Sequence, residues 1–174
     1  LSAFPRLLIP ALVAACMVGL QFFTPKQPIY TSKLRRFVVL LIIAAIAVAN
    51  ITSLQLLFEA MLHATSKQAP QLLFSAAGIY FTNIVIFGLL YWEIDDGGPG
   101  QRRVPDDEGR DLLFPQQDLS YKLKKRWYPT FVDYLYVSIT NATAFSPTDT
   151  LPLTRRTKVI MGLQALASLI IVVL

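Results

Sequence analysis

The chain has 174 residues, of which 54% are hydrophobic and 16% charged, against roughly 25% charged in an ordinary soluble domain. Mean hydropathy is +0.50. This composition excludes disorder over most of the length, and the long uncharged blocks exclude an ordinary soluble globule. The single cysteine, Cys16, excludes an intrachain disulfide framework and a cysteine-rich metal site. The net charge of +5 is confined to short connections, so no nucleic acid partner is expected.

Four apolar blocks are long enough to cross a bilayer, which takes about 20 helical residues. They are Leu7–Phe23, Phe37–Leu57, Gln71–Trp92 and a block from Thr157 that is still apolar at Leu174. We therefore predict an all-α integral membrane protein with four transmembrane helices, the first two within residues 1–70. The chain starts without Met and stops inside an apolar run, so we expect both ends to be incomplete.

Basic residues are unevenly divided between the two sides that these spans define. Fourteen Lys and Arg residues lie in the connections 24–36 and 93–128 and just before the fourth span, whereas Arg6 and Lys67 alone lie on the other side. Loops with an excess of Lys and Arg are usually cytoplasmic. We therefore predict that the loops 24–36 and 93–128 face the cytoplasm.

The spans contain few polar residues, and two interpretations of them stay open. The first is hydrogen bonding between helices, and the second is the lining of an ion or substrate path. Two interpretations are also open for Glu59 and His63, which lie one turn apart. They are either interfacial residues that reach water or a pair that binds a proton or a metal ion. The spans carry no nucleophile–base pair and no metal cluster, so we expect neither an enzyme nor a cofactor or metal. The polar residues in the spans are Asn50, Thr52, Ser53, Gln55, Ser75, Thr82, Asn83, Gln164 and Ser168.

Residues 93–128 form the only clearly aqueous stretch. It opens with Asp95 and Asp96 followed by Gly97-Gly98, which predicts an acidic cap and a turn. The apolar run 112–115 is expected to dip into the membrane interface. Lys122–Trp127 combines basic residues with an aromatic anchor, which suits anionic lipid headgroups.

The segment 129–154 predicts a re-entrant helix and loop. Pro129 favours a helix start, and Thr130–Thr143 reads as a short helix with Phe131, Leu135 and Ile139 on one stripe. Fourteen helical residues span roughly 21 Å, which is too short to cross a hydrocarbon core of about 30 Å. Asp133 and Asn141 also argue against a lipid-facing crossing. A polar extended return to the fourth span then makes a loop that survives in a membrane only against protein or water.

At these residues the sequence resembles the pore loop of potassium-channel-like proteins. Leu135–Ser138 stands where the pore helix carries its aromatics and Ser, and Asp149, Pro152, Thr154 and Lys158 match the Asp, Pro, Thr and basic positions. The resemblance covers about Ser75–Leu174. It implies an outer helix at 71–92, an aqueous loop at 93–128, a re-entrant helix and loop at 129–154, and an inner helix at 155–174.

The positions that correspond to the selectivity filter depart from this family. After Thr143 they read Ala144, Phe145, Ser146, Pro147 and Thr148, with both glycines absent. Successive backbone carbonyls coordinate a dehydrated potassium ion, and the glycines supply that backbone geometry. We therefore predict a loop that is not potassium-selective, with Ser146, Thr148, Asp149 and exposed carbonyls as the oxygen ligands for a cation.

The wider pattern is similar to a group of uncharacterised bacterial multi-pass membrane proteins, on the stretches 91–99, 113–116 and 131–154. This resemblance implies the plasma (inner) membrane of a bacterium. The basic connections then place the pore loop on the cytoplasmic side, inverted relative to potassium channels, as in glutamate-receptor-type channels. The expected function is a cation-conducting homo-oligomer, with four copies as the natural number and lipids and small cations as partners. The alternative is a non-conducting scaffold or accessory subunit of the same architecture.

Overall fold

The computed structural model describes residues 33–99, 110–117, 127–143 and 149–174. Three of its helices are long and apolar enough to cross a membrane, over Arg36–Leu62, Ala69–Gly97 and Arg155–Val173. They correspond to the second, third and fourth predicted spans, and the first, Leu7–Phe23, lies outside the described residues. In chain order the elements are α2 (Lys33–Leu62), η1 (Ser66–Gln68), α3 (Ala69–Ile94), η2 (Asp95–Gly97), β1 (Leu112–Leu113), α5 (Phe131–Ala142), β2 (Leu151–Pro152) and α6 (Arg155–Val173).

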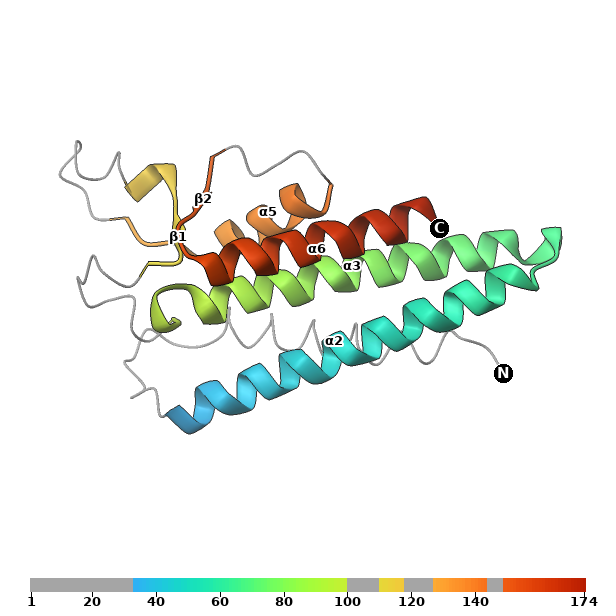
Figure 1. The fold of residues 1–174 in the computed structure, drawn as a ribbon, viewed down its shortest axis with the longest axis horizontal. Coiled ribbons are helices and arrows are strands. Elements are labelled where there is room, and N and C mark those ends of the chain that lie inside the picture. The colour runs from blue at the N-terminus through green and yellow to red at the C-terminus, as the bar shows by residue number, and fades with distance from the viewer. Residues whose placement is uncertain (1–32, 100–109, 118–126, 144–148) are drawn as a thin grey trace.

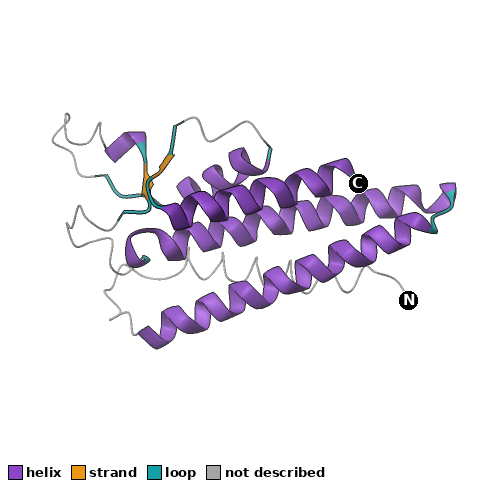
Figure 2. Cartoon of the chain, in the orientation of Figure 1, coloured by secondary structure: helices purple, strands orange, loops and turns teal. Residues whose placement is uncertain are grey.

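The long helix α3 is the centre of the bundle, with α2, α5 and α6 packed around it (Figures 1 and 2). Ile43 and Ile46 of α2 meet Ile86 and Leu89 of α3 in one apolar cluster. A second cluster joins α3, α5, α6 and β1 around Tyr91. The outward faces of α2 and α6 remain apolar and exposed, as expected for helices surrounded by lipid.

Helix α3 ends in a turn whose backbone only certain residues adopt readily. Asp95 is extended, with φ −64° and ψ 129°. Asp96, Gly97 and Gly98 then have φ of 48°, 72° and 95°. Positive φ costs little for glycine and is tolerated by Asp. The predicted turn at Gly97-Gly98 is therefore confirmed, and it directs the chain away from the end of α3.

The short helix α5 lies within one residue of the predicted range 130–143 at each end. Thr130 and Asp133 form a capping box, in which the Asp133 carboxylate accepts from the Thr130 amide at 2.6 Å. The helix therefore begins after Thr130 rather than at Pro129. Of the predicted stripe, Phe131 is buried, Leu135 is half-buried and Ile139 is exposed. The buried face of the helix continues from Phe131 through Tyr134, Val137, Ser138, Asn141 and Ala142.

The path of the chain around α5 starts and finishes at one end of the bundle (Figure 1). Near its start, the Tyr134 hydroxyl donates to Asp95 at the C-terminal end of α3. Near the C-terminal end of α5, the Asn141 side chain donates to the Met161 carbonyl, two turns into α6. Strand β2 is back at the first end, because Leu151 and Pro152 pair with Leu113 and Leu112 of β1. Twelve helical residues extend about 18 Å, so α5 covers only part of the length of α3.

Part of the segment predicted to be aqueous belongs to the protein core. Leu112 and Phe114 are buried in the cluster around Tyr91 and Tyr134, rather than in the membrane interface. Phe114 meets Tyr134 edge to face, with ring centroids 5.2 Å apart. Burial against three helices explains why an apolar run occurs within a charged connection. Residues 100–109 and 118–126, which carry most of the charge of this segment, lie outside the described residues.

Candidate functional site

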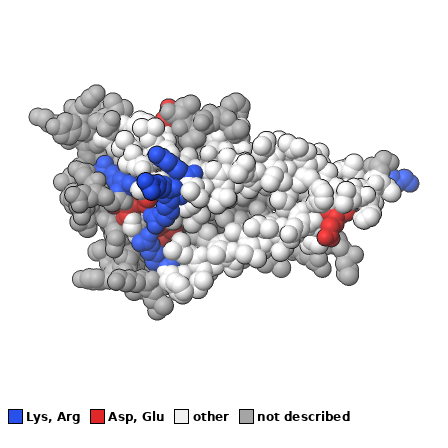
Figure 3. Space-filling model, in the orientation of Figure 1, with Lys and Arg blue, Asp and Glu red and all other residues white. Residues whose placement is uncertain are grey.

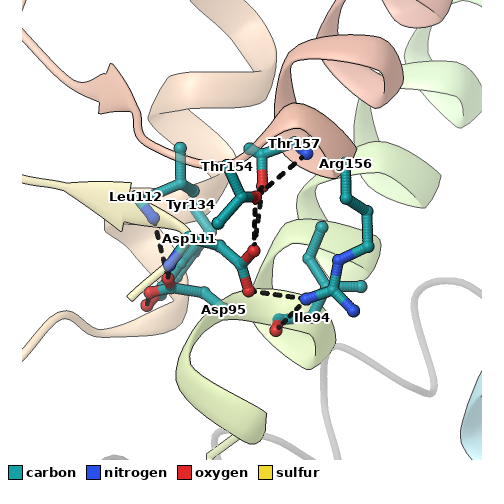
Figure 4. Close-up of polar contacts among 8 residues, drawn as sticks. All are labelled: Ile94, Asp95, Asp111, Leu112, Tyr134, Thr154, Arg156 and Thr157. Atoms are coloured by element: carbon teal, nitrogen blue, oxygen red, sulfur yellow. Dashed lines mark hydrogen bonds and ion pairs between the residues drawn. The ribbon is translucent and has the colours of Figure 1, made fainter. Parts of the chain in front are cut away.

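Two groups of hydrogen-bonded polar side chains, most of them buried, lie around α5. The first, here called the end cluster, comprises Asp95, Asp111, Tyr134, Thr154, Arg156 and Thr157, and it joins the adjacent ends of α3, α5 and α6 to β1 (Figure 4). The second, here called the mid-bundle cluster, comprises Tyr91, Ser138, Asn141 and Gln164.

Asp95 fixes the returning connection to α3 and α5. Its Oδ1 accepts from the Asp111 amide at 3.0 Å and from the Leu112 amide at 2.9 Å, and its Oδ2 accepts from the Tyr134 hydroxyl at 2.5 Å. Hydrogen bonds to an ionised acceptor are about twice as strong as neutral ones. A carboxylate buried to this degree is costly unless it is fully bonded, so these three donors explain why Asp95 is tolerated there.

Asp111 performs the corresponding task at the start of α6. Its Oδ1 accepts from the Thr154 hydroxyl at 2.6 Å and from the Thr157 hydroxyl at 3.3 Å. Its Oδ2 pairs with Arg156 at 2.6 Å, and the same guanidinium nitrogen donates to the Ile94 carbonyl at 3.1 Å. Because the Arg156 side chain is 54% exposed, solvent screens this ion pair and the hydroxyl bonds contribute the larger share.

The mid-bundle cluster links three helices through one side chain, Gln164. Its amide nitrogen donates to the Ser138 carbonyl at 2.9 Å and to the Ser138 hydroxyl at 2.7 Å. Its amide oxygen accepts from the Tyr91 hydroxyl at 2.5 Å and from the Asn141 amide at 2.9 Å. Ser138 in turn donates to the Ile84 carbonyl at 2.6 Å. The C-terminal half of α5 is thereby fixed between α3 and α6.

The interpretation of span polar residues as links between helices is confirmed for some of them and wrong for others. Gln164 acts in this way, and the Asn83 amide donates to the Ser168 hydroxyl at 3.0 Å. The hydroxyls of Thr52, Ser53, Ser75 and Thr82 instead donate to carbonyls three or four residues earlier in their own helix. A hydroxyl satisfied in this way has no need of a partner on a neighbouring helix.

The structure brings several of the residues predicted for the pore module together and separates others. Thr154 caps α6 and bonds Asp111, Pro152 pairs with Leu112, and Asn141 is buried in the mid-bundle cluster. Asp133 caps α5 at the opposite end from Thr143, whose hydroxyl bonds the Ile139 carbonyl. Asp149 and Lys158 are exposed near the first end of the bundle. The filter positions Ala144, Phe145, Ser146, Pro147 and Thr148 lie outside the described residues.

The sequence interpretation missed most of the end cluster. Asp111 and Arg156 are 45 residues apart, and no periodicity connects them. Asp95 was expected to cap a helix in water, and Tyr134 carried no signal beyond its aromatic ring. One usable signal was present: Asp111 directly precedes an apolar run within a charged segment, which is where a buried carboxylate can be sought.

Charge is separated along the bundle. Among the described residues, Lys and Arg gather at the end where α6 begins, and an uncharged band covers the helices beyond it (Figure 3). Arg110, Arg155, Arg156 and Lys158 belong to this end, whereas Lys67 lies in the connection between α2 and α3 at the other end. Across ranges 33–99, 110–117, 127–143 and 149–174, no three His, Cys, Asp or Glu side chains form a potential metal site. Within these ranges, the end cluster and the mid-bundle cluster hold α3, α5 and α6 together and contain no set of metal ligands.

The chain matches no family model, no curated protein and no solved structure.

Proposed function

We propose that the chain is the subunit of an ion-channel-like membrane protein that conducts small cations without potassium selectivity. The observation that supports this best is the path of α5, which begins beside Asp95, extends partway along α3 and is followed by a return to β2 at the starting end. Re-entrant segments place irregular backbone at membrane depth, where it is tolerated when it is buried in protein or lines a water-filled cavity.

The electrostatics of α5 favour a cation at its C-terminal end. A helix dipole places about half a negative charge at the C-terminal end of a helix. This end of α5 is accessible, because its C-cap residue Thr143 is exposed. We propose that the oxygens of residues 144–149 complete the path, with Asp149 exposed at its mouth. The absence of both filter glycines is the reason for proposing weak selectivity.

One subunit cannot enclose a pore, so the proposal includes a homo-oligomer, with four copies as the simplest ring. Helix α5 offers a surface for this contact: Val132, Tyr136 and Ile139 are exposed at spacings of four and three residues and therefore share one face. Contact between copies along this face would bring the segments that follow α5 toward a common axis.

Conduction is tested with the purified chain in liposomes that contain a fluorescent cation indicator. We expect flux of sodium and potassium above that of empty liposomes, and reduced flux or altered selectivity for Asp149→Ala. Glu59→Gln removes an exposed acid near the other end of the bundle and serves as the matched control. Absence of flux from protein shown to be inserted would refute conduction.

The second candidate is a non-conducting scaffold or accessory subunit. It is favoured by one observation: Asn83, Ser138, Asn141 and Gln164, which could line a path, donate or accept hydrogen bonds within a single chain. Polar groups engaged in this way are less free to coordinate a passing ion. The liposome experiment separates the two candidates, because a scaffold inserts and oligomerises without passing ions.

The proposed location is a bacterial plasma membrane with the basic end of the bundle in the cytoplasm. The gathering of Arg110, Arg155, Arg156 and Lys158 at one end supports this orientation. Single cysteines replacing Lys67 and Arg110, in a background lacking Cys16, test it with a membrane-impermeant thiol reagent applied to whole cells. We expect labelling at position 67 and protection at position 110, and the reverse pattern would overturn the orientation.

A further inference from the structure

The face of α6 turned away from α3 and α5 begins with two exposed basic residues. Arg155 and Lys158 lie three residues apart, so their side chains are neighbours on the helix surface. Within the described residues neither forms an ion pair, and the nearby Asp111 carboxylate is engaged by Arg156. Among the described residues, two positive charges therefore have no ion-pair partner, and they belong to the end of the bundle where Lys and Arg gather (Figure 3).

An exposed apolar stripe continues the same face along the helix. Val159, Leu166, Leu169 and Val173 follow at helical spacing and are all more than half exposed. Gly162 interrupts the stripe, and a Cβ built there would meet no heavy atom within 4 Å. The face thus consists of a pair of cations followed along the helix by an apolar surface, with open space over Gly162, here called the notch, between Val159 and Leu166.

We infer that this face of α6 binds one anionic phospholipid, whose headgroup phosphate lies between Arg155 and Lys158 and whose acyl chain lies over Gly162. The order of charge and apolar surface along the helix matches the order of the two parts of an amphiphile. An anionic headgroup is favoured over a zwitterionic one because its net negative charge compensates the two cations. The inference is independent of conduction, since a scaffold would bind the lipid equally well.

Native mass spectrometry of the detergent-solubilised full chain, titrated with phosphatidylglycerol or phosphatidylcholine, tests the charge requirement. Each basic residue near anionic lipid contributes about fivefold in affinity. We expect phosphatidylglycerol to be retained more strongly, and the double variant Arg155→Gln/Lys158→Gln to bind it about 25-fold more weakly. Lys67→Gln, which removes an exposed cation at the other end, is expected to leave retention unchanged.

Filling the notch tests the proposed place of the acyl chain. Gly162→Leu is expected to lower the retention of both lipids, whereas Gly78→Leu, at another glycine with open space, is expected to change neither. Equal retention of the two lipids, or wild-type retention by the double variant, would overturn the inference. Loss of oligomers in Gly162→Leu with unchanged lipid retention would assign this face to contact with a second copy and would also overturn it.

Discussion

Replacement of Gln164 by Leu tests the mid-bundle cluster directly. Leucine is similar in size and apolar, so the change removes hydrogen bonds without creating a large cavity. Four bonds disappear, two from the amide nitrogen to Ser138 and two to the amide oxygen from Tyr91 and Asn141. Ser138 and Asn141 each keep one bond to a backbone carbonyl, at Ile84 and Met161.

The expected loss follows from the value of a single bond between membrane helices. Measured contributions average about 0.6 kcal/mol. Four such bonds correspond to roughly 2 kcal/mol of unfolding free energy. Ser138 and Asn141 keep their carbonyl bonds, whereas the buried Tyr91 hydroxyl loses its acceptor, so this figure is a lower bound. For a chain of this length that loss lowers the midpoint of thermal unfolding by about 4–8 °C.

Unfolding of the purified protein in detergent micelles, followed by far-ultraviolet circular dichroism, measures this change. Gln55→Leu is the matched control, because Gln55 lies on the exposed surface of α2 and the same substitution there leaves buried polar groups untouched. We expect Gln55→Leu to unfold at or slightly above the wild-type temperature. Equal stability of the two variants would refute the reasoning that Gln164 holds α5 between α3 and α6.

Three further predictions concern the elements that frame α5. Asp111→Ala removes the threonine hydroxyl bonds as well as the ion pair, and it is expected to destabilise the protein by about 1–3 kcal/mol in denaturant titrations. Arg156→Gln removes the ion pair alone and is expected to cost under ~1 kcal/mol, because that side chain is half exposed. Equal losses would contradict the assignment of most of the energy to the threonine hydroxyls. Gly88→Val is expected to cost about 1–3 kcal/mol of unfolding free energy, because a Cβ at this position would lie 3.3 Å from a side chain of α5. Gly78→Val, at a glycine with open space around it, is expected to cost little. Similar melting curves for the two variants would argue against close packing of α3 on α5. Thr130→Ala removes the cap of α5 at a cost of about 1 kcal/mol and should accelerate hydrogen exchange in its first turn; unchanged exchange there would show that tertiary contacts alone hold the helix start.

Sequence alone was sufficient for the elements whose signal is local. The apolar blocks Phe37–Leu57 and Gln71–Trp92 predicted α2 and α3. A helix that crosses a bilayer needs about 20 consecutive apolar residues, and such a run can be recognised directly in the sequence. The short helix α5 was also predicted to within one residue at each end, because its length follows from consecutive residues, although the Thr130–Asp133 cap that sets its start was not predicted. The turn after Asp95 followed from two adjacent glycines.

Only the tertiary structure decided which polar residues are partners. Asp111 and Arg156 are 45 residues apart, and Tyr91 and Gln164 are 73 apart, so no pattern within one helix relates them. The buried face of α5 shares Phe131 with the predicted stripe but then departs from it, because Ser138 and Asn141 donate to acceptors on neighbouring helices while Ile139 is exposed. Hydrophobicity along a chain sets which segments leave water, but the pairing of buried polar groups depends on distances between segments, and those exist only once the helices have packed.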